Sequence, residues 1–380
     1  MMAAAVQVAP SGLEGVVVTD TQIGDVRGTE GFFQYRGYDA TDLARNCRLE
    51  EVWHLLLYGD LPDTTEADRF TDRIAGLRRD FTPALFDRVH QVTAGATDRV
   101  AALRTAWSLA AADLGARPWL DLSPQQRIDQ ALALAAVGPL LVAATHRPGV
   151  AADLDDLPAS TAAAYLQLVT GEAAKPDRVT ALERYLVLTI DHGLNASTFT
   201  ARVVASTGAD LGAVLVAAVG ALSGPLHGGA PSLALEMLDD IATPDRAEAW
   251  IRDAVGRGER IMGFGHRIYR TEDPRARLLR ETAQELGGPR IDLALHVEQT
   301  ARRVLRELKP DRVLDVNVEY HAAIVMDAAG LPPALFTPTF AVSRAIGWTA
   351  HALEQMDGNR IMRPNSRYTG PEPVRPIRPR

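Results

Sequence analysis

The sequence predicts an all-α protein with a small β-hairpin near its N-terminus. Apolar residues recur at helical spacing along most of the chain. β-prone residues gather in only two short early segments, Val16–Thr19 and Phe32–Tyr35, with Gly28 and Gly31 between them. This strand content is too low for a parallel sheet, so we expect helices to build the core.

After the hairpin, the sequence predicts a nearly continuous series of helices. The helical pattern begins at Leu43, Val52 and Leu55–Leu57. Further helices cover residues 100–114, 125–144, 162–168, 181–190, 211–222, 233–240, 246–256, 275–286, 291–308, 320–329 and 340–355. Segment 211–222 is almost wholly apolar, so we expect it to be buried on all sides. The apolar run 131–144 is shorter than the roughly 18–20 residues of a membrane span, which indicates a buried helix and no membrane partner.

Length and composition restrict the class of protein. A chain of 380 residues has room for two domains. The net charge of -8 argues against a nucleic-acid-binding surface over the whole protein. Cys47 is the only cysteine, which excludes an internal disulfide. Since the N-terminus lacks the basic region of a secretory signal, we expect a cytoplasmic protein.

Known cofactor motifs do not account for the sequence. GFGH at 263–266 resembles the start of a dinucleotide fingerprint, but Ile268 stands at the third glycine position, and no strand with an acidic residue about 20 positions on follows. P-loop and HEXXH motifs are absent, and the nine histidines form no metal pattern. We therefore expect neither a metal nor a cofactor.

Three histidines lie beside helix breakers or polar clusters. His192 lies in DHGLNASTF, His227 in GPLHGGA and His266 in GFGHR. A single histidine is more often structural than chemical. His227 has the strongest setting, because the two glycines after it allow a ligand to approach the backbone closely.

The segment 261–277 gathers positive charge around His266. Asp273 and Pro274 form a good helix start, which places Arg275 in the first turn. A cation is disfavoured there unless it shares an anion, such as a carboxylate, with the free backbone N–H groups. A solvated helix end with exposed arginines is an equally good interpretation. Glu319, at a second loop-to-helix step, either complements the helix dipole or acts as a general base.

Together these motifs resemble citrate synthase. The resemblance runs from Gly12 to Pro371 and rests on YRGYDATDLA, DHGLNASTFTAR, GPLHGGA, IMGFGHRIYRTEDPRA, NVEY, FTPTFAVSRAIGWTAHALEQ and NRIMRPNSRYTGP. It implies a mostly helical homodimer whose active-site cleft closes when oxaloacetate binds. The large domain would comprise residues 1–228 and 329–380, and the small, CoA-binding domain residues 229–328. The basic tail PEPVRPIRPR is either disordered or an arm on the neighbouring subunit.

The resemblance also assigns site residues. Oxaloacetate would be bound by His192, His227, His266, Arg275, Arg344 and, from the partner subunit, Arg363. CoA would be bound by Met262, Gly263, Phe264, Gly265, Arg270 and Asn317. Glu319 would take a proton from the acetyl methyl group of acetyl-CoA. A neutral His227 would then hydrogen-bond the thioester oxygen, and His266 would polarise the ketone. Hydrolysis of citryl-CoA would release citrate and CoA without a metal.

Two positions depart from the family pattern. The base is usually Asp, where this sequence has Glu319, and the residue after His192 is usually acidic, where this sequence has Gly193. A branch of second-copy citrate synthases resembles this chain at both positions. The alternatives are 2-methylcitrate synthase, which uses propionyl-CoA, an enzyme that condenses another acyl-CoA with a keto acid, and a non-catalytic homologue that binds ligand.

Overall fold

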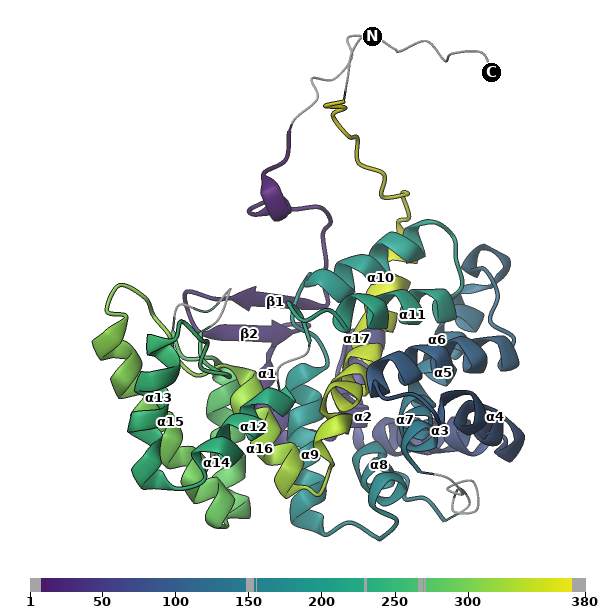
Figure 1. Ribbon diagram of the computed structural model, residues 1–380. Coiled ribbons are helices and arrows are strands. Elements are labelled where there is room, and N and C mark those ends of the chain that lie inside the picture. The colour runs from purple at the N-terminus through teal and green to yellow at the C-terminus, as the bar shows by residue number, and fades with distance from the viewer. Residues whose placement is uncertain are drawn as a thin grey trace, which may run out of the picture.

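The computed structural model describes residues 8–147, 154, 156–228, 231–265, 269 and 271–370. This part of the chain is mostly helical, as predicted, with a three-stranded antiparallel sheet near the N-terminus (Figure 1). The strands are β1 (Gly24–Arg27), β2 (Phe32–Tyr35) and β3 (Tyr38–Asp39). The helices are α1 (Ala40–Asn46), α2 (Leu49–Tyr58), α3 (Thr64–Arg79), α4 (Pro83–Thr93), α5 (Arg99–Asp113), α6 (Pro124–Ala136), α7 (Gly138–His146), α8 (Thr161–Thr170), α9 (Pro176–Thr189), α10 (Ala196–Ser206), α11 (Leu211–Leu222), α12 (Pro231–Ile241), α13 (Ala247–Gly256), α14 (Pro274–Leu286), α15 (Pro289–Leu308), α16 (Val318–Ala328) and α17 (Phe336–Asp357).

The hairpin is present, but its first strand was predicted at the wrong place. β2 pairs with β1, in the register Gly24↔Tyr35 to Arg27↔Phe32, and not with Val16–Thr19. The turn begins directly after Arg27, so the residues nearest to it in sequence pair with β2, since short connections are favoured in antiparallel hairpins. Val16–Thr19 instead lies outside the strands, and its valines are exposed.

The predicted helix 125–144 is two helices, α6 and α7, separated at Val137. Pro139 explains the break, because it has no N–H to donate to the preceding turn. Together, Pro124–His146 has the length and apolar character of a membrane span, but 78% of its most apolar window is buried inside the fold. The expectation of a buried segment is confirmed.

Three helices were not predicted, namely α3, α4 and α10. α3 is polar overall, yet its buried residues Ala67, Phe70, Ile74 and Ala75 follow helical spacing. In addition, its N-cap Asp63 and Glu66 form a capping box. A narrow apolar stripe between charged residues therefore suffices for a surface helix.

The prediction that 211–222 is buried on all sides was wrong. α11 buries Leu215, Ala218 and Leu222 against α5, α10 and α17, whereas Val216 and Ala217 on its other face remain partly exposed. Apolar composition alone does not show which side of a helix is covered.

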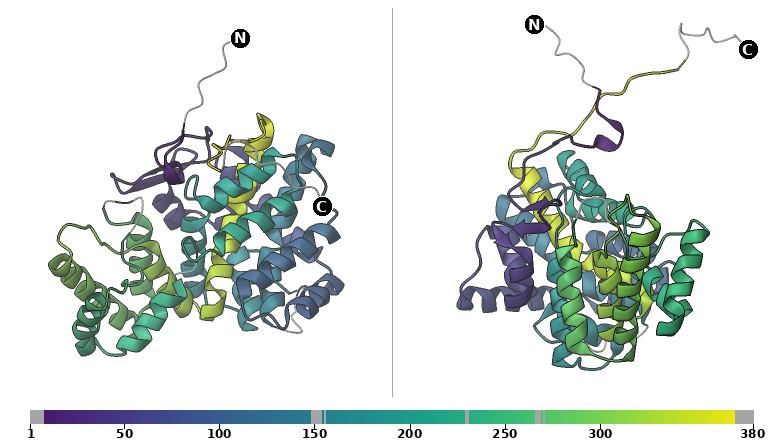
Figure 2. Two further views of the ribbon diagram at one scale, coloured as in Figure 1. Left: turned by 45° about the horizontal axis from the view of Figure 1, so that its top comes forward. Right: turned by 90° about the vertical axis from the view of Figure 1, so that its left-hand side faces the viewer.

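α17 is the central helix of the larger group of helices, and it contacts α6, α7, α9, α10 and α11 (Figure 1). The helices α12 to α16 lie together on the other side of α9, which contacts α14 and α16. Extended segments at both ends of the described chain leave the helical body on the same side (Figure 2). Because α9 contacts α17 as well as α14 and α16, it lies between the two groups of helices.

Candidate active site

The chain reversal that follows α9 holds His192. This side chain is buried, and its Nε2 atom lies 3.0 Å from the Tyr269 hydroxyl. The ring of Phe33, on β2, meets the imidazole edge-on at a centroid distance of 5.7 Å. The N-terminal hairpin and Tyr269 together fix the orientation of His192.

His227 follows α11, as predicted, and its ring lies against the start of α10. The backbone N–H of Ser197 donates to Nε2 of His227 at 3.3 Å, and the Ser197 hydroxyl is 2.8 Å from the same atom. A backbone N–H can only donate, so Nε2 carries a lone pair and the hydrogen of a neutral ring is on Nδ1. Burial and the charge of Arg344 lower the pKa of His227 to about 4, so the ring is neutral at pH 7.

Ser197 is itself held in place by two neighbours. Its hydroxyl lies 2.8 Å from Oδ1 of Asn195, so its single hydrogen is shared between this oxygen and Nε2 of His227. The same Oδ1 caps α10 through the backbone N–H of Thr198. The indole N–H of Trp348, on α17, donates to the Ser197 hydroxyl at 3.2 Å. Residues of α10 and α17 thus hold Ser197, whose backbone N–H sets the tautomer of His227.

α14 begins as predicted, with Asp273 as the N-cap and Pro274 in the first turn. Arg275 is only 3% exposed, which excludes the interpretation of a solvated arginine. The Asp273 carboxylate accepts from Nε and Nη2 of Arg275, at 3.0 and 2.8 Å. It also accepts from the backbone N–H of Val318, at 3.1 Å, and so joins the starts of α14 and α16.

Arg344 is a second buried arginine, and it lies on α17. Its Nε donates to the Thr189 carbonyl at 2.8 Å, and its guanidinium lies 4.7 Å from the centroid of the Phe340 ring. Burial lowers the pKa of Arg344, while the charge of Asp191 raises it and that of Arg275 lowers it. Two buried guanidinium groups therefore act on each other electrostatically, an arrangement suited to an anionic ligand.

Glu319 is the second residue of α16, as its loop-to-helix position predicts. Its backbone N–H donates to the N-cap side chain of Asn317 at 3.0 Å. Burial raises the pKa of the Glu319 carboxyl to about 7, and the charge of Asp273 adds to this effect against that of Arg275. Such a carboxylate is a stronger base than an ordinary glutamate and is well matched to neutral pH.

The predicted CoA-binding segment, Met262–Gly265, pairs directly with the chain that leads to Glu319. Gly265 N–H donates to the Asp315 carbonyl at 2.7 Å, and Asn317 N–H donates to the Gly263 carbonyl at 2.9 Å. The Asn317 side chain donates to the Gly265 carbonyl, also at 2.9 Å. Through these bonds, Asn317 directly links the predicted CoA-binding segment to the start of α16.

Gly263 has a structural requirement of its own. Its φ is +78°, and a Cβ atom there would approach Cβ of Tyr320 to 2.6 Å. Only glycine fits, because it tolerates this backbone conformation and leaves room for the tyrosine. The neighbouring Phe264 ring meets Tyr320 edge-on, at a centroid distance of 5.5 Å.

Three predicted residues lie elsewhere or outside the described residues. His266 and Arg270 belong to the part of the chain that is not described. Arg363 is exposed in the extended segment after α17, which runs away from the helical body (Figure 1). The other predicted oxaloacetate-binding and catalytic residues lie in the segments after α9 (His192) and α11 (His227), in the first turns of α14 (Arg275) and α16 (Glu319), and in the middle of α17 (Arg344).

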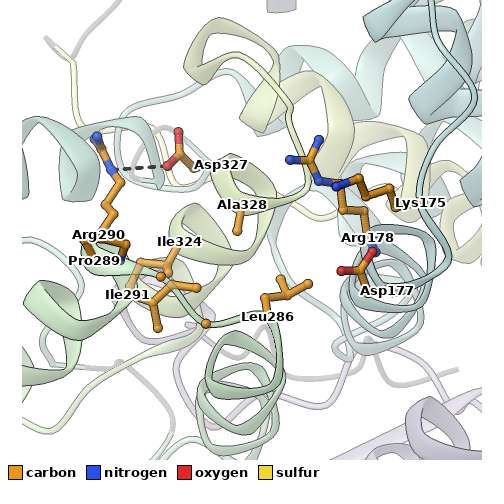
Figure 3. Close-up of a pocket in the computed structure, with 12 residues that line it drawn as sticks. Lys175, Asp177, Arg178, Leu286, Pro289, Arg290, Ile291, Ile324, Asp327 and Ala328 are labelled. Atoms are coloured by element: carbon orange, nitrogen blue, oxygen red, sulfur yellow. Dashed lines mark hydrogen bonds and ion pairs between the residues drawn. The ribbon is translucent and has the colours of Figure 1, made fainter.

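A cavity of about 330 Å³ lies apart from these residues. It is bounded by the start of α9, the turn between α14 and α15, and the end of α16 (Figure 3). Its charged lining includes Lys175, Arg178, and Arg290 in an ion pair with Asp327 at 3.2 Å. None of the predicted site residues lines this cavity.

Comparison with known proteins covers nearly the whole chain. Residues 12–365 match the family described as citrate synthase, C-terminal domain. The citrate synthase of Haloferax volcanii is 38% identical over 363 residues, which are 94% of this chain and 95% of the relative. Citrate synthase 2 of Bacillus subtilis is 37% identical over 380 residues, 96% of each protein. The chain belongs to the citrate synthase family.

Other citrate synthase relatives bear on the fold and the substrate. The structure of Thermoplasma acidophilum citrate synthase, a ternary complex with carboxymethyl coenzyme A and oxaloacetate, matches with a TM-score of 0.85 at 28% identity and covers 96% of this chain and 97% of that one. The 2-methylcitrate synthase of Shewanella oneidensis is 35% identical over 370 residues, 97% of this chain and 96% of the relative. The resemblance and the all-α citrate synthase fold are confirmed, and the protein is an acyltransferase.

Sequence reasoning missed several residues that support this citrate synthase site. Asp273 was recognised only as a helix cap, although it also binds Arg275 and the start of α16. Tyr269, Ser197 and Trp348 were not considered. Tyr269 and Ser197 lie near predicted residues in the sequence, three positions from His266 and five from His192, and this short spacing is a signal that could have found them. Trp348 gives no such signal.

Proposed function

We propose that this enzyme condenses acetyl-CoA with oxaloacetate and hydrolyses citryl-CoA to citrate and CoA. The observation that carries the proposal is a matched acid–base pair. His227 is neutral with its hydrogen on Nδ1, and Glu319 has a pKa raised to about 7. A fixed hydrogen-bond donor and a desolvated carboxylate are the two groups that enolisation of a thioester needs.

Glu319 removes a proton from the acetyl methyl group, and the electron pair of the C–H bond moves toward the thioester oxygen. The Nδ1–H group of His227 donates to that oxygen as negative charge develops on it. The methylene carbon of the enol then attacks the oxaloacetate ketone, which His266 polarises. Water cleaves the thioester of citryl-CoA, so that citrate and the free thiol of CoA leave.

The two carboxylates of oxaloacetate are bound by buried cations. Arg275 supplies one from the first turn of α14 and Arg344 the other from the middle of α17, and His192 adds a polar contact. Asp273 holds the Arg275 guanidinium in a fixed plane, so that little side-chain entropy is lost when substrate binds. Dicarboxylate binding would close the cleft between residues 229–328 and the remainder of the chain.

CoA binds on the other side of the cleft. Met262, Gly263, Phe264 and Gly265 offer backbone groups on a segment fixed by Asn317, and Arg270 contacts phosphate. No resident cofactor takes part, because proton transfer and C–C bond formation are supplied by side chains.

The active form is a homodimer in the cytoplasm. Partly exposed apolar residues on α10 and α11, Val203, Val204, Val216 and Ala217, form a surface suited to a second subunit. Leu226, just after α11, is 94% exposed. The chain after α17 runs outward, which would allow Arg363 to enter the partner's site.

The proposed location in the cytoplasm is supported by the single cysteine, Cys47, which suits a reducing compartment.

A second candidate is 2-methylcitrate synthase, favoured by the full-length relative from Shewanella oneidensis. It differs only in the acyl group, and one methylene changes binding by about 1–3 kcal/mol. A non-catalytic homologue is disfavoured by the presence of His227 and both buried arginines.

The test is steady-state thiol release with oxaloacetate and acetyl-CoA, with propionyl-CoA in parallel. Turnover with acetyl-CoA, at a higher kcat/KM than with propionyl-CoA, supports the proposal. A preference for propionyl-CoA assigns the 2-methylcitrate reaction. A folded protein that releases thiol from neither contradicts both, and calorimetry with oxaloacetate then shows whether it binds ligand without catalysis.

A further inference from the structure

Next to His192, a buried series of three hydrogen-bonded side chains connects the segment after α9 with α17 and α10. Asp191 directly precedes His192, and its Oδ1 is 3.1 Å from Nε2 of His351. On the other side of the ring, Nε of Arg202 donates to Nδ1 of His351 at 3.1 Å. Each of these three residues is at most 1% exposed.

The geometry fixes the protonation of His351. An arginine Nε–H can donate but not accept, so Nδ1 of His351 must carry a lone pair. The ring hydrogen is then on Nε2 and donates to the Asp191 carboxylate. The imidazole is therefore a neutral bridge between a buried cation and a buried anion, with one tautomer.

Both ends of the chain are anchored to further groups. The second carboxylate oxygen of Asp191 accepts from Gly193 N–H at 3.0 Å, and its backbone carbonyl accepts from the Tyr35 hydroxyl at 2.9 Å. Arg202 forms an ion pair with Glu354, while its Nη1 donates to Gln355 at 3.2 Å. The peptide group after His192 is thus held by the Asp191 carboxylate, and the one before it by the Tyr35 hydroxyl.

Each of the three connected segments carries or contacts a residue of the oxaloacetate site. Asp191 continues into His192. Arg202 lies on α10, whose first turn holds the ring of His227 through Ser197. His351 lies two turns after Arg344 on α17, which places both side chains on the same face of that helix. A rotation of the His351 ring would break its hydrogen bonds to Asp191 and Arg202, and would so loosen the contacts between these three segments.

We propose that His351, held between Asp191 and Arg202, is a positioning residue that sets the mutual placement of His192, His227 and Arg344 for oxaloacetate. The inference rests on the proposed function. Apolar side chains of similar volume often stabilise a core at least as well as a buried ion pair does. The bridged arrangement therefore indicates that the oxaloacetate site requires one fixed geometry, because a catalytic site loses activity when the groups that support it are loose.

The experiment compares two substitutions of His351. His351→Gln can still accept from Arg202 and donate to Asp191, whereas His351→Leu can do neither. His90→Leu is the matched control, since His90 lies on α4, away from the site residues, and its Nδ1 is 3.0 Å from the Ala144 carbonyl. Kinetics for oxaloacetate and acetyl-CoA are measured separately, together with oxaloacetate binding by calorimetry and the melting temperature.

We expect His351→Leu to lower kcat/KM for oxaloacetate by roughly 10- to 100-fold, because a misplacement of about 1 Å can cost on the order of a hundredfold. The KM for acetyl-CoA should change by less than about threefold, since the CoA segment is built by other residues. His351→Gln should recover most of the loss, and His90→Leu should match the wild type. Nitrogen NMR of wild-type His351 should show Nδ1 without a proton.

The outcomes separate this inference from the function beneath it. An active wild type with a protonated Nδ1 on His351, or a folded His351→Leu variant with unchanged oxaloacetate kinetics, overturns the inference alone. Equal losses for both substrates, without recovery by His351→Gln, assign His351 a merely structural role and also overturn it. If His351→Leu does not fold, the oxaloacetate kinetics of His351→Gln and the NMR result for wild-type His351 decide. A wild type that neither binds oxaloacetate nor releases thiol overturns the proposed function and this inference together.

Discussion

Glu319 has one methylene more than the aspartate usual in its family, so its position in the structure matters for the chemistry. Its backbone is tied to Asn317, and Asn317 is tied to the CoA segment. The carboxyl therefore keeps a fixed origin, and its extra length, about 1.5 Å, must be taken up by the side chain alone. The sequence shows the substitution but not the burial that raises the pKa of this group to about 7.

Substitution of Glu319 tests its role as base. We expect Glu319→Gln to lower kcat by about 10²- to 10⁴-fold, which is the usual contribution of a general base. Glu319→Asp keeps the charge but retracts it, and should cost on the order of a hundredfold. In the wild type, kcat/KM should fall tenfold per pH unit below about pH 7, because only the ionised carboxylate of the free enzyme accepts a proton. A pH-independent kcat/KM between pH 5 and 7 would contradict this role.

The same pKa has a consequence for folding stability that does not depend on activity. The folded pKa of Glu319, about 7, lies above the ordinary value of 4.5 for a glutamate. Between these values, the folded state binds more protons than the unfolded one, so stability falls as pH rises from about 4.5 to 7. Glu319→Gln should remove this loss and be more stable than the wild type at pH 8, by on the order of 1–3 kcal/mol. Urea unfolding at pH 5 and 8 measures the difference.

Gly193 stands where the family usually has an acidic residue, and its backbone explains why glycine is suitable. Its φ is +62°, and a Cβ atom would lie 3.4 Å from Val26 of β1. We expect Gly193→Ala to destabilise the fold by about 1–2 kcal/mol, the cost of the left-handed conformation for an L-residue. Gly76→Ala, in open space on α3, is the control and should be neutral or stabilising. Equal effects of both changes on urea unfolding would contradict the expectation.

At the scale of elements, the start of α14 shows what sequence reasoning could and could not reach. The Asp-Pro pair predicts the helix start and places Arg275 in the first turn, because capping is local chemistry. The second function of Asp273 is not local, since Val318 lies 45 positions away. The first strand was predicted at the wrong place although the deciding signal is local. The β-prone residues Val16–Thr19 suit a strand, but the turn after Arg27 determines which residues pair with β2.

Asp273 should couple Arg275 to the helix that carries Glu319. Asp273→Asn removes the charge from a buried pair with Arg275, and breaking such a pair costs about 3–5 kcal/mol. We expect a lower melting temperature and a raised KM for oxaloacetate, because the guanidinium loses its fixed plane. The exposed Asp311→Asn is the control. An Asp273→Asn variant with wild-type stability and oxaloacetate KM would show that the bridge is not required.

At the scale of the whole molecule, the family motifs indicated nearly the entire architecture, since the fold is shared from Gly12 onward. Composition did not show which apolar surfaces remain uncovered. α11 and the chain after α17 leave apolar and basic groups exposed, among them Val216, Ile361 and Arg363. A homodimer would cover the first and give Arg363 an anion to bind, and this arrangement can be tested without a structure of the dimer.

Complementation between two inactive variants tests whether Arg363 acts in the partner's site. Arg363→Ala should lose oxaloacetate turnover because a carboxylate contact is missing, and Glu319→Gln should lose it because the base is missing. In a mixed dimer, one site combines the intact Glu319 of one subunit with the intact Arg363 of the other. After refolding of an equal mixture, half of the dimers are mixed and each has one good site, so about a quarter of wild-type activity should return. If Arg363 served its own subunit, every site would lack one of the two groups, and activity would stay at the level of the separate variants. A monomer by sedimentation at assay concentration would contradict the dimer itself.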